Sequence, residues 1–485
     1  MTTSETGRLS TGVDGLDGVL DGGLLGGRSY LVRGAPGTGK TVLGLHFLTE
    51  GAAAGESVLY INLEEATDDI RENATALGFD LSGVTFLDLS PSSAFFAEDQ
   101  SYSIFEADEV DREPIQRRIR DSVDEMEPDR VFVDPVTQFR YLSSDEFQFR
   151  KEVISFMRYL KEADATVLFT SQRSAETPDD DLQFLADGIV ELRRDDEGRS
   201  LSVPKFRGSD RQSGAHSMEI TDAGISVYPI LDPGDHATEF DTTPIPSGNA
   251  ELDTLLGGGI ERGTITVVSG PTGVGKTTTG TLFMQAAADQ GERSAIYHFE
   301  ESPRTFRHRC ESIGIPVSTL ETDGALTVEA VEALDYSAEQ FAAHVREQVE
   351  ERGVSVVMID GINGYKLSLQ GNEDALVGKL HALGRYLKNM GVTVIFVDEV
   401  GSVTGSFEAT EAGISYLADN VVFLRHIELN GELRKVVGVL KKRVSTFERT
   451  LREFEITSDG IVIGDPLTDA SGLLEGTPDI ERSDR

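Results

Sequence analysis

A glycine-rich phosphate-binding pattern occurs twice in this chain, and it constrains the fold more than any other feature. Residues 34–41 match G-x-x-x-x-G-K-[ST], and residues 270–277 match it again. Each copy follows a short apolar run and precedes apolar residues at helical spacing, which is the strand–loop–helix context in which the pattern holds nucleotide phosphates. Two matches in this context argue against a plain glycine-rich turn. The sequence therefore predicts two nucleotide sites.

The residues of the two loops have distinct expected roles. Glycines let the backbone curl so that successive N–H groups point at phosphate oxygens, and the helix N-terminus adds positive potential. Lys40 and Lys276 are expected to reach the outer phosphates, and the Thr41 and Thr277 hydroxyls to ligate Mg²⁺. The predicted nucleotide-binding residues are Gly34, Pro36, Gly37, Thr38, Gly39, Lys40 and Thr41, then Gly270, Thr272, Gly273, Val274, Gly275, Lys276 and Thr277.

The loops belong to a tandem repeat. Lys40 recurs as Lys276, Glu64 as Glu300 and Lys205 as Lys441, a constant separation of 236 positions. The join is expected near residues 229–246, where Pro, Gly, Asp and Thr cluster. We predict an N-terminal domain over residues 1–232, a C-terminal domain over 244–466, and a flexible acidic tail over 467–485.

Each half alternates short β-branched runs with helical patterns, which predicts an α/β fold with a mostly parallel sheet flanked by helices. Helices are expected after each phosphate loop and before the third and fourth strands, for example over 153–161 and 376–388. The predicted strands are 29–32, 58–63, 130–133, 166–170 and 188–192 in the first half, and 265–269, 294–299, 354–359, 393–397 and 420–424 in the second.

Composition indicates the setting. The formal net charge is −40, with acids scattered through all 485 residues and most cations being Arg, which is typical of the salty cytoplasm of a halophilic archaeon. At molar salt the Debye length is about 3 Å, so this charge does not exclude a nucleic-acid partner. No apolar run approaches about 18 residues, so we expect a cytoplasmic protein with neither membrane span nor signal peptide. The single cysteine, Cys310, is expected to be a small buried hydrophobe.

Two aspartates stand where an apolar strand ends: Asp134 and Asp360. In a parallel sheet this position faces the ligand crevice, and nucleotide hydrolysis needs an acid there to hold the Mg²⁺ shell. Either residue alone could be an ordinary strand-end aspartate, but both occur in register. They are therefore predicted, with Thr41 and Thr277, to bind the metal.

A glutamate pair ends another strand in each half: Glu64-Glu65 and Glu300-Glu301. Adjacent acids raise one another's proton affinity, which favours a base that polarises the attacking water near neutral pH. The alternative is a cap for the following helix, and in one half alone the two interpretations are equally good. The duplication favours a catalytic role for all four glutamates.

The halves differ at the end of the fourth strand, where residues 171–173 read Ser-Gln-Arg and residues 397–399 read Val-Asp-Glu. A group that senses hydrolysis is expected here, so the halves are predicted to do different jobs. Late in each half a cation pair is expected on a strand, where alternating residues point to one face. The pair is either a solvated edge or a means of neutralising charge on the γ-phosphate. If these cations act on a neighbouring subunit, they imply a ring with ATP at each interface; they are Lys205, Arg207, Lys441 and Arg443.

These features together resemble the KaiC family, double-domain relatives of RecA within the P-loop ATPases. The resemblance runs from about Thr11 to Asp465 and also rests on residues 205–208, 414–424 and 452–456. It implies two tandem RecA-like domains, a homohexamer of two stacked rings, and ATP with Mg²⁺ at the subunit interfaces. It further implies slow ATPase activity in the N-terminal ring and serine/threonine autokinase activity in the C-terminal ring, with regulatory or signalling proteins as partners.

The resemblance also implies roles for single residues. Glu64 and Glu65 would serve hydrolysis, Glu300 would be the kinase base, and the four late cations would reach a neighbour's phosphates. The family's phosphorylated pair is a Ser followed by a Thr, whereas this chain has Ser415-Tyr416, with Thr410 earlier in the same loop. Ser415 is thus the predicted phosphosite, and Val444 stands where a glycine is expected after the second cation motif.

A second interpretation is a RecA-like motor acting on DNA in recombination or repair. It would need a basic or aromatic loop that binds phosphates or stacks bases, and the sequence offers none, although salt adaptation weakens this argument. An acidic segment with scattered aromatics, residues 98–114, is expected to be a solvated loop or helix at the edge of the sheet. Residues 176–181 are expected to be a solvated loop.

Overall fold

The chain forms two compact units, residues 1–230 and 231–485. The computed structural model describes residues 7–91, 112–143, 145–172, 180–195, 198–235, 240–332, 334–369, 372–401, 416–429, 431–468, 470–471 and 479–480.

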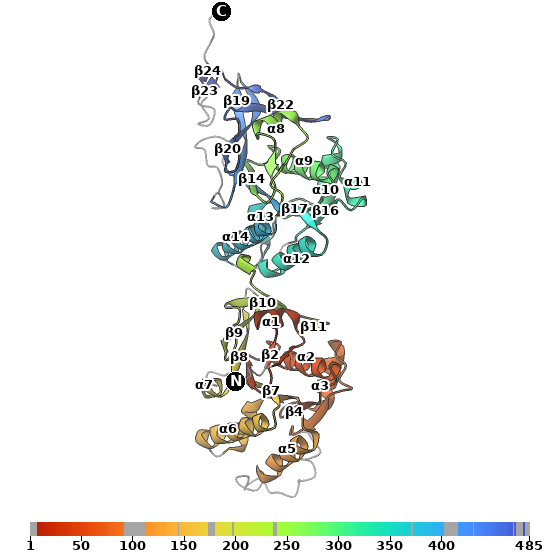
Figure 1. The fold of residues 1–485 in the computed structure, drawn as a ribbon, viewed down its shortest axis with the longest axis vertical. Coiled ribbons are helices and arrows are strands. Elements are labelled where there is room, and N and C mark those ends of the chain that lie inside the picture. Colours follow the sequence, from red (N-terminus) through yellow and green to blue (C-terminus); the bar gives the residue numbers. More distant parts are fainter. Residues whose placement is uncertain are drawn as a thin grey trace, which may run out of the picture. The chain divides into compact units, whose positions relative to one another are not determined.

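The first unit, coloured from red to yellow in Figure 1, is built on a nine-stranded sheet with the order β11-β10-β9-β8-β3-β7-β6-β4-β5. The strands from β8 to β5 in this order are parallel, and the remaining three continue the sheet in antiparallel pairs. The strands are β3 (Ser29–Gly34), β4 (Val58–Asn62), β5 (Thr85–Asp88), β6 (Arg130–Asp134), β7 (Thr166–Gln172), β8 (Gly188–Asp195), β9 (Gly198–Phe206), β10 (Ala215–Thr221) and β11 (Gly224–Tyr228).

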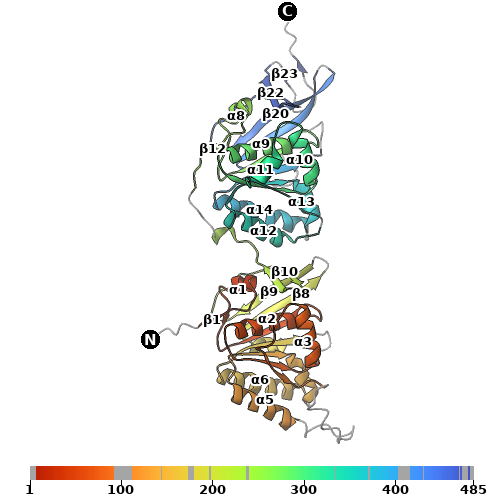
Figure 2. The ribbon, with the colours of Figure 1, turned by 90° about the vertical axis from the view of Figure 1, so that its right-hand side faces the viewer.

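Helices cover both faces of this sheet (Figure 2), because successive residues of its buried strands point to opposite sides. Tyr30 and Val32 of β3 pack with one set of helices, whereas Leu31 packs with the other. The first set comprises α1 (Asp14–Val19), α2 (Lys40–Ala53) and α3 (Thr67–Ala76). The second comprises α5 (Arg112–Met126), α6 (Glu146–Glu162) and α7 (Asp180–Leu185).

The second unit repeats this topology with the order β16-β15-β17-β18-β14-β19-β20-β21-β22. Its strands from β16 to β19 are parallel, and those from β20 to β22 are antiparallel. The strands are β14 (Ile265–Gly270), β15 (Arg293–His298), β16 (Leu326–Ala330), β17 (Val354–Asp360), β18 (Thr393–Glu399), β19 (Asn420–Leu429), β20 (Glu432–Lys442), β21 (Arg452–Thr457) and β22 (Gly460–Pro466).

Two helical layers again enclose the sheet of the second unit. One core contains residues of α8 (Ala250–Leu255), α9 (Lys276–Asp289), α10 (Pro303–Glu311) and α11 (Val317–Thr322). Cys310 lies in this core, fully buried and free, as predicted. The other core contains residues of α12 (Ala338–Glu350), α13 (Ile362–Ser368) and α14 (Glu373–Asn389).

Short elements complete the described chain. Three two-stranded pairs are antiparallel: β1 (Arg8–Leu9) with β2 (Leu24–Leu25), β12 (Pro244–Ile245) with β13 (Ile260–Glu261), and β23 (Ala470–Ser471) with β24 (Asp479–Ile480). Two 3₁₀ helices are η1 (Val136–Leu142) and η2 (Pro233–Asp235).

The predicted fold class and all ten predicted strands are confirmed. Most strands differ from the prediction by one or two residues at an end, but β8 and β19 continue further, to Asp195 and Leu429. These two strands extend because each pairs with its successor in a long antiparallel hairpin beyond the parallel core. The predicted helices over 153–161 and 376–388 lie within α6 and α14.

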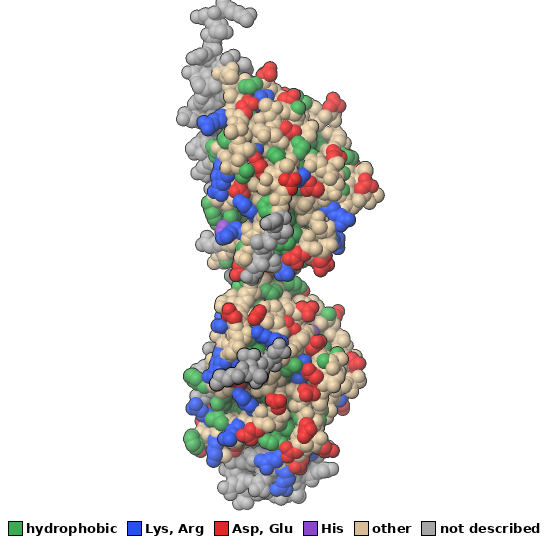
Figure 3. Space-filling model, viewed as in Figure 1, with side chains coloured by type: hydrophobic (Ala, Val, Ile, Leu, Met, Phe, Trp, Pro, Cys, Tyr) green, Lys and Arg blue, Asp and Glu red, His purple; other side chains and the backbone are tan. Residues whose placement is uncertain are grey.

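Several predictions fall outside the described residues. They concern Ser415, Thr410, Arg173, most of the acidic segment 98–114, most of the tail and residues 176–179 of the expected loop 176–181, whose last two residues begin α7. On the face drawn in Figure 3, acidic side chains are scattered over both units among basic ones. No helix of the described ranges is both long and apolar enough to cross a membrane.

Candidate nucleotide-binding sites

The strand order of the first unit gathers its predicted site at one edge of the sheet. The phosphate loop follows β3, Gln172 ends β7, Asp134 ends β6, and the glutamate pair follows β4. These four parallel strands are consecutive neighbours in the sheet. Their carboxyl ends therefore meet at one crevice, which is where open α/β sheets bind ligands.

The first phosphate loop leads directly into α2. Gly39 precedes that helix with φ +104°, a left-handed conformation that strongly favours glycine. The Lys40 ammonium lies against the loop and donates hydrogen bonds to the carbonyl oxygens of Gly34 at 3.0 Å and Ala35 at 3.1 Å. Burial lowers the pKa of Lys40, whereas the charge of Asp134 acts in the opposite direction.

Asp134 is the most enclosed acid of the first pocket. Its Oδ2 accepts hydrogen bonds from the Thr41 hydroxyl at 2.7 Å and the Tyr60 hydroxyl at 3.2 Å, and its Oδ1 accepts one from Thr170. Burial raises the pKa of Asp134, and the hydrogen bonds from Thr170, Thr41 and Tyr60 lower it; the net direction is upward. The carboxylate thus sits beside the hydroxyl expected to share the metal.

The glutamate pair of the first unit lies at the same crevice. Glu64 accepts a hydrogen bond at 2.5 Å from the Gln172 side-chain amide, and the Asn62 side chain donates to the carbonyl of Glu65. Burial raises the pKa of Glu65, and the nearby charges of Asp134 and Glu64 raise it further. The arrangement supplies a carboxylate with increased proton affinity near Asp134, the aspartate predicted to bind the metal.

The second pocket has the same outline. The Lys276 ammonium donates to the carbonyl oxygen of Pro271 at 2.9 Å, and the Thr277 hydroxyl donates to Asp360 Oδ1 at 3.0 Å. Burial lowers the pKa of Lys276, against the charges of four surrounding carboxylates. These are Glu399, Asp360, Glu300 and Asp398.

The two glutamates of the second pocket have different partners. Glu300 accepts a hydrogen bond at 3.3 Å from the backbone N–H of Gly364, and burial and the charge of Glu399 raise its pKa. It lies so close to Gly361 (φ +96°) that a Cβ there would come within 2.9 Å of the carboxyl carbon. Glu301 instead binds the Arg309 guanidinium through both oxygens, at 3.2 and 2.6 Å.

The late cations do not contribute to the pocket of their own unit. Lys205 pairs with Ile189 at the beginning of β8, and the Arg207 backbone N–H bonds the carbonyl of Asp187. In the sheet, Asp187 is level with Ser29, which lies five residues before Gly34. At about 3.3 Å per residue, this places the Arg207 backbone about 16 Å along the strand from the start of the phosphate loop. Lys441 and Arg443 occupy the equivalent positions beside Val421 and Asp419. Both cation pairs therefore face the amino ends of the parallel strands.

The cation pairs also depart from the predicted strand pattern. Lys205 and Lys441 lie on β9 and β20, but Arg207 and Arg443 lie just after these strands end. The lysines donate to backbone carbonyls, Lys205 to Gln183 at 2.7 Å and Lys441 to Ala418 at 2.6 Å. The alternating face expected from the sequence therefore holds only for part of each motif.

Four further residues complete the pockets and were not identified from the sequence: Tyr60, Thr170, His298 and Arg309. Tyr60 lies two residues before the end of β4 and His298 is the last residue of β15, and each bonds an aspartate on the neighbouring strand. Their spacing from the glutamate pair was a usable signal. Which strand lies beside which, however, follows only from the sheet.

The fold and the two pockets define a P-loop α/β protein of two tandem nucleotide-binding units. A family described as "ATPase: KaiC" matches residues 9–232 and 245–468. The chain belongs to the KaiC family.

Curated relatives align over nearly the whole chain. The circadian clock protein KaiC3 of Synechocystis is 28% identical over 492 residues, covering 97% of this chain and 94% of the relative. The circadian clock oscillator protein KaiC of Acaryochloris marina is 28% identical, covering 98% and 92%. The protein of that name from Synechococcus elongatus is 26% identical, covering 97% and 92%.

The raised pKa of Asp134 leads to a prediction about stability. A carboxyl whose pKa is higher in the folded than in the unfolded state opposes folding once pH exceeds its unfolded value. Asp134→Asn should therefore increase the stability of the first unit at pH 7 without nucleotide. In hydrogen-exchange measurements, the backbone amides of β6 and α2 should exchange more slowly in this variant than in the wild type.

Asp88 provides a control of opposite sign. Burial raises its pKa, but hydrogen bonds from Ser90 and Thr67 outweigh burial and leave the pKa lowered. Its charge therefore stabilises the fold above the unfolded pKa, and Asp88→Asn should cost about 1 kcal/mol at pH 7. Faster exchange in the Asp134 variant, or equal effects of the two substitutions, would contradict this account.

Proposed function

We propose that this chain is an ATP-binding and ATP-hydrolysing regulatory protein of the KaiC type. One observation carries the proposal: in both units a phosphate-loop lysine, a threonine–aspartate pair and a glutamate of raised pKa meet at the carboxyl ends of neighbouring strands. Phosphoryl transfer needs these parts, a cradle for the phosphates, a metal site and a base. We assign one ATP-binding domain to residues 1–232 and the other to residues 244–466, and an acidic tail to residues 467–485.

The donor sets fit Mg²⁺. A hydroxyl and a carboxylate oxygen lie side by side in each pocket, Thr41 with Asp134 and Thr277 with Asp360, and Mg²⁺ prefers oxygen ligands. These residues would hold the ion of a bound Mg²⁺–ATP. When bound, the ion neutralises negative charge on the phosphates.

In the first unit, Glu64 and Glu65 would act on the attacking water. Glu65 has the higher proton affinity expected of a base, since burial and two neighbouring acids raise its pKa. Gln172 holds Glu64 by a hydrogen bond and thereby fixes its orientation. Lys40 would leave the loop carbonyls and bind the outer phosphates of the nucleotide.

Replacing both glutamates tests this assignment. Glu64→Gln with Glu65→Gln should retain ATP binding but reduce turnover by the first unit at least about 100-fold, because the base is lost and the phosphate cradle remains. Phosphate release and the binding of a fluorescent ATP analogue would be measured in Lys276→Ala chains, so that only the first pocket is read.

Glu72→Gln is the matched control, since Glu72 lines the same acidic hollow as Glu64 and Glu65 and is exposed as they are, but lies within α3 and not in the loop after β4. It should keep the turnover of the parent chain. Undiminished turnover in the double variant would refute the catalytic role of the pair.

In the second unit we propose serine/threonine autokinase activity. Burial and the charge of Glu399 raise the pKa of Glu300, which suits a base that takes the proton of an attacking hydroxyl. The hydroxyl oxygen would form a bond to the γ-phosphorus, and the bond between that phosphorus and the ADP oxygen would break. Ser415 is the proposed acceptor, because the residues around it resemble the family's phosphorylated loop.

Labelling with γ-³²P ATP tests the autokinase. Wild-type chain should incorporate phosphate, and Ser415→Ala and Glu300→Gln should each lose most of the label, while Thr410→Ala serves as the loop control and keeps it. Equal labelling of wild type and Ser415→Ala would reject Ser415 as the acceptor, and no labelling at all would reject the kinase.

We further propose a homohexamer in which the late cations complete a neighbour's pocket. The cation pairs and the pockets lie at opposite ends of the parallel strands in each unit, so a head-to-tail ring would bring one against the other. Lys205 and Arg207 would then serve the first-unit pocket, and Lys441 and Arg443 the second. Regulatory or signalling proteins would be the further partners.

Mixed assemblies test the shared pocket. Lys40→Ala chains and Arg207→Ala chains should each hydrolyse little ATP in the first unit, but a random one-to-one mixture should regain up to about a quarter of wild-type activity, because some pockets combine an intact lysine with an intact arginine. Light scattering in molar KCl with Mg²⁺–ATP would give the assembly mass. A mixture no more active than its parents, or a monomer under these conditions, would contradict the ring.

A further inference from the structure

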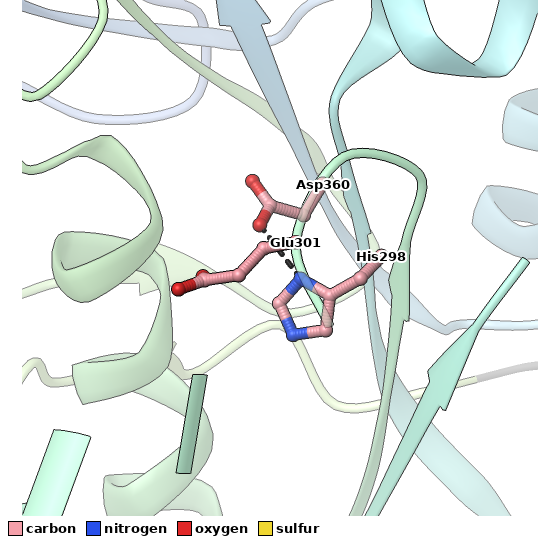
Figure 4. A group of neighbouring side chains, drawn as sticks. All are labelled: His298, Glu301 and Asp360. Atoms are coloured by element: carbon pink, nitrogen blue, oxygen red, sulfur yellow. Dashed lines mark hydrogen bonds and ion pairs between the residues drawn. The ribbon is translucent and has the colours of Figure 1, made fainter. Parts of the chain in front are cut away.

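A histidine and two acids converge beside the second pocket (Figure 4). His298 ends β15, Glu301 lies in the loop after it, and Asp360 ends the neighbouring strand β17. One ligand atom of each lies within 4.8 Å of the others. Imidazole and carboxylate groups at this spacing are the donors that divalent first-row transition metals bind in proteins.

His298 has the environment of a metal ligand. Its side chain is completely buried, and Nδ1 lies 2.8 Å from Asp360 Oδ2. Among the described residues Nε2 is buried and has no hydrogen-bond partner. A neutral imidazole keeps a lone pair on one nitrogen, and with the proton on Nε2 that lone pair lies on Nδ1, where one cation could bind both Nδ1 and Asp360 Oδ2.

This position is separate from the one that Mg²⁺–ATP would use. The two oxygens of Asp360 face different groups, since Oδ1 accepts from the Thr277 hydroxyl and Oδ2 contacts His298. One carboxylate can thus serve two neighbouring cation positions, one on the side of the phosphate loop and one on the side of the imidazole.

The charge of the second pocket favours an additional cation. Five carboxylates interact electrostatically with Lys276 or Arg309. They are Glu300, Glu301, Asp360, Asp398 and Glu399. Arg309 engages both oxygens of Glu301, but a carboxylate has about four lone-pair positions, so each oxygen keeps one for a cation. Two cationic side chains leave the group of five acids with excess negative charge.

The first unit does not repeat this arrangement. Asn62 pairs with Asp134 in the sheet as His298 pairs with Asp360, and its amide bonds the carbonyl of Glu65. Ser171 and Gln172 end β7 where Asp398 and Glu399 end β18. The first pocket therefore has neither the imidazole nor the two additional acids.

We propose that the second unit binds a divalent first-row transition cation through His298, Glu301 and Asp360, at a position adjacent to that of the nucleotide's Mg²⁺. A nitrogen donor favours such a cation over Mg²⁺, which prefers a shell of oxygens. The first unit lacks this second position. The inference does not require that the chain hydrolyse ATP.

Mn²⁺ alone is the probe, added to the full chain in molar KCl without nucleotide, so that every nearby nitrogen belongs to the protein. Pulsed electron paramagnetic resonance should show coupling of Mn²⁺ to an imidazole ¹⁴N. His298→Asn, which installs the side chain found at this position in the first unit, should abolish the coupling and weaken Mn²⁺ binding at least about tenfold.

His344→Asn is the control, because His344 also pairs with a carboxylate, Glu329 at 2.6 Å, at a distance from the pocket. It should keep both the coupling and the affinity. Glu301→Gln retains the histidine, so it should weaken binding but keep the nitrogen coupling. Absence of ¹⁴N coupling in the wild type, or its persistence in His298→Asn, would overturn the proposal.

Discussion

A buried carboxylate beside a threonine hydroxyl organises each nucleotide pocket. Asp134 and Asp360 end central strands, where an unpaired charge would be costly. The protein satisfies Asp134 with three hydroxyl donors and Asp360 with a hydroxyl and an imidazole. Because each donor comes from a different strand or helix, the contact fixes the phosphate loop against the rest of the sheet. This arrangement sets the position of the phosphate-loop lysine and of the glutamate pair. It also sets the position of the residue that ends the neighbouring strand, Gln172 in the first unit and Glu399 in the second.

The two pockets share this framework but differ in the groups around it. The first surrounds its aspartate with neutral donors, Thr170 and Tyr60, and holds Glu64 by the amide of Gln172. In the second pocket, acids and an imidazole stand where the first has neutral groups. Burial and the charge of Glu399 raise the pKa of Glu300. Repeated topology thus gives two sites of the same outline that differ in the charge around the aspartate. This difference underlies the proposal that one unit hydrolyses ATP and that the other transfers phosphate to a protein hydroxyl.

Much of this could be read from the sequence because the relevant signals are local. The phosphate loops, the strand-end aspartates and the glutamate pairs each lie within a few residues of a strand, and short β-branched runs between helical patterns located all ten predicted strands. Tyr60, Thr170 and His298 were missed, since their roles depend on which strands lie side by side. The sequence also could not tell that Lys205 and Arg207 face away from the pocket of their own unit, because the direction of β9 depends on how it pairs with β8.

From sequence alone follow the duplication, the two nucleotide sites, the α/β class and the pairs of acids, because glycine, lysine and strand-end carboxylates act through the backbone conformation of their immediate neighbours. Only the tertiary structure decided the strand order, the hydrogen-bond partners of Asp134 and Asp360, and the convergence of His298 with Glu301 and Asp360. The physical reason is that sheet register joins residues distant in the chain, and the free energy of a buried charge depends on those partners and not on sequence neighbours.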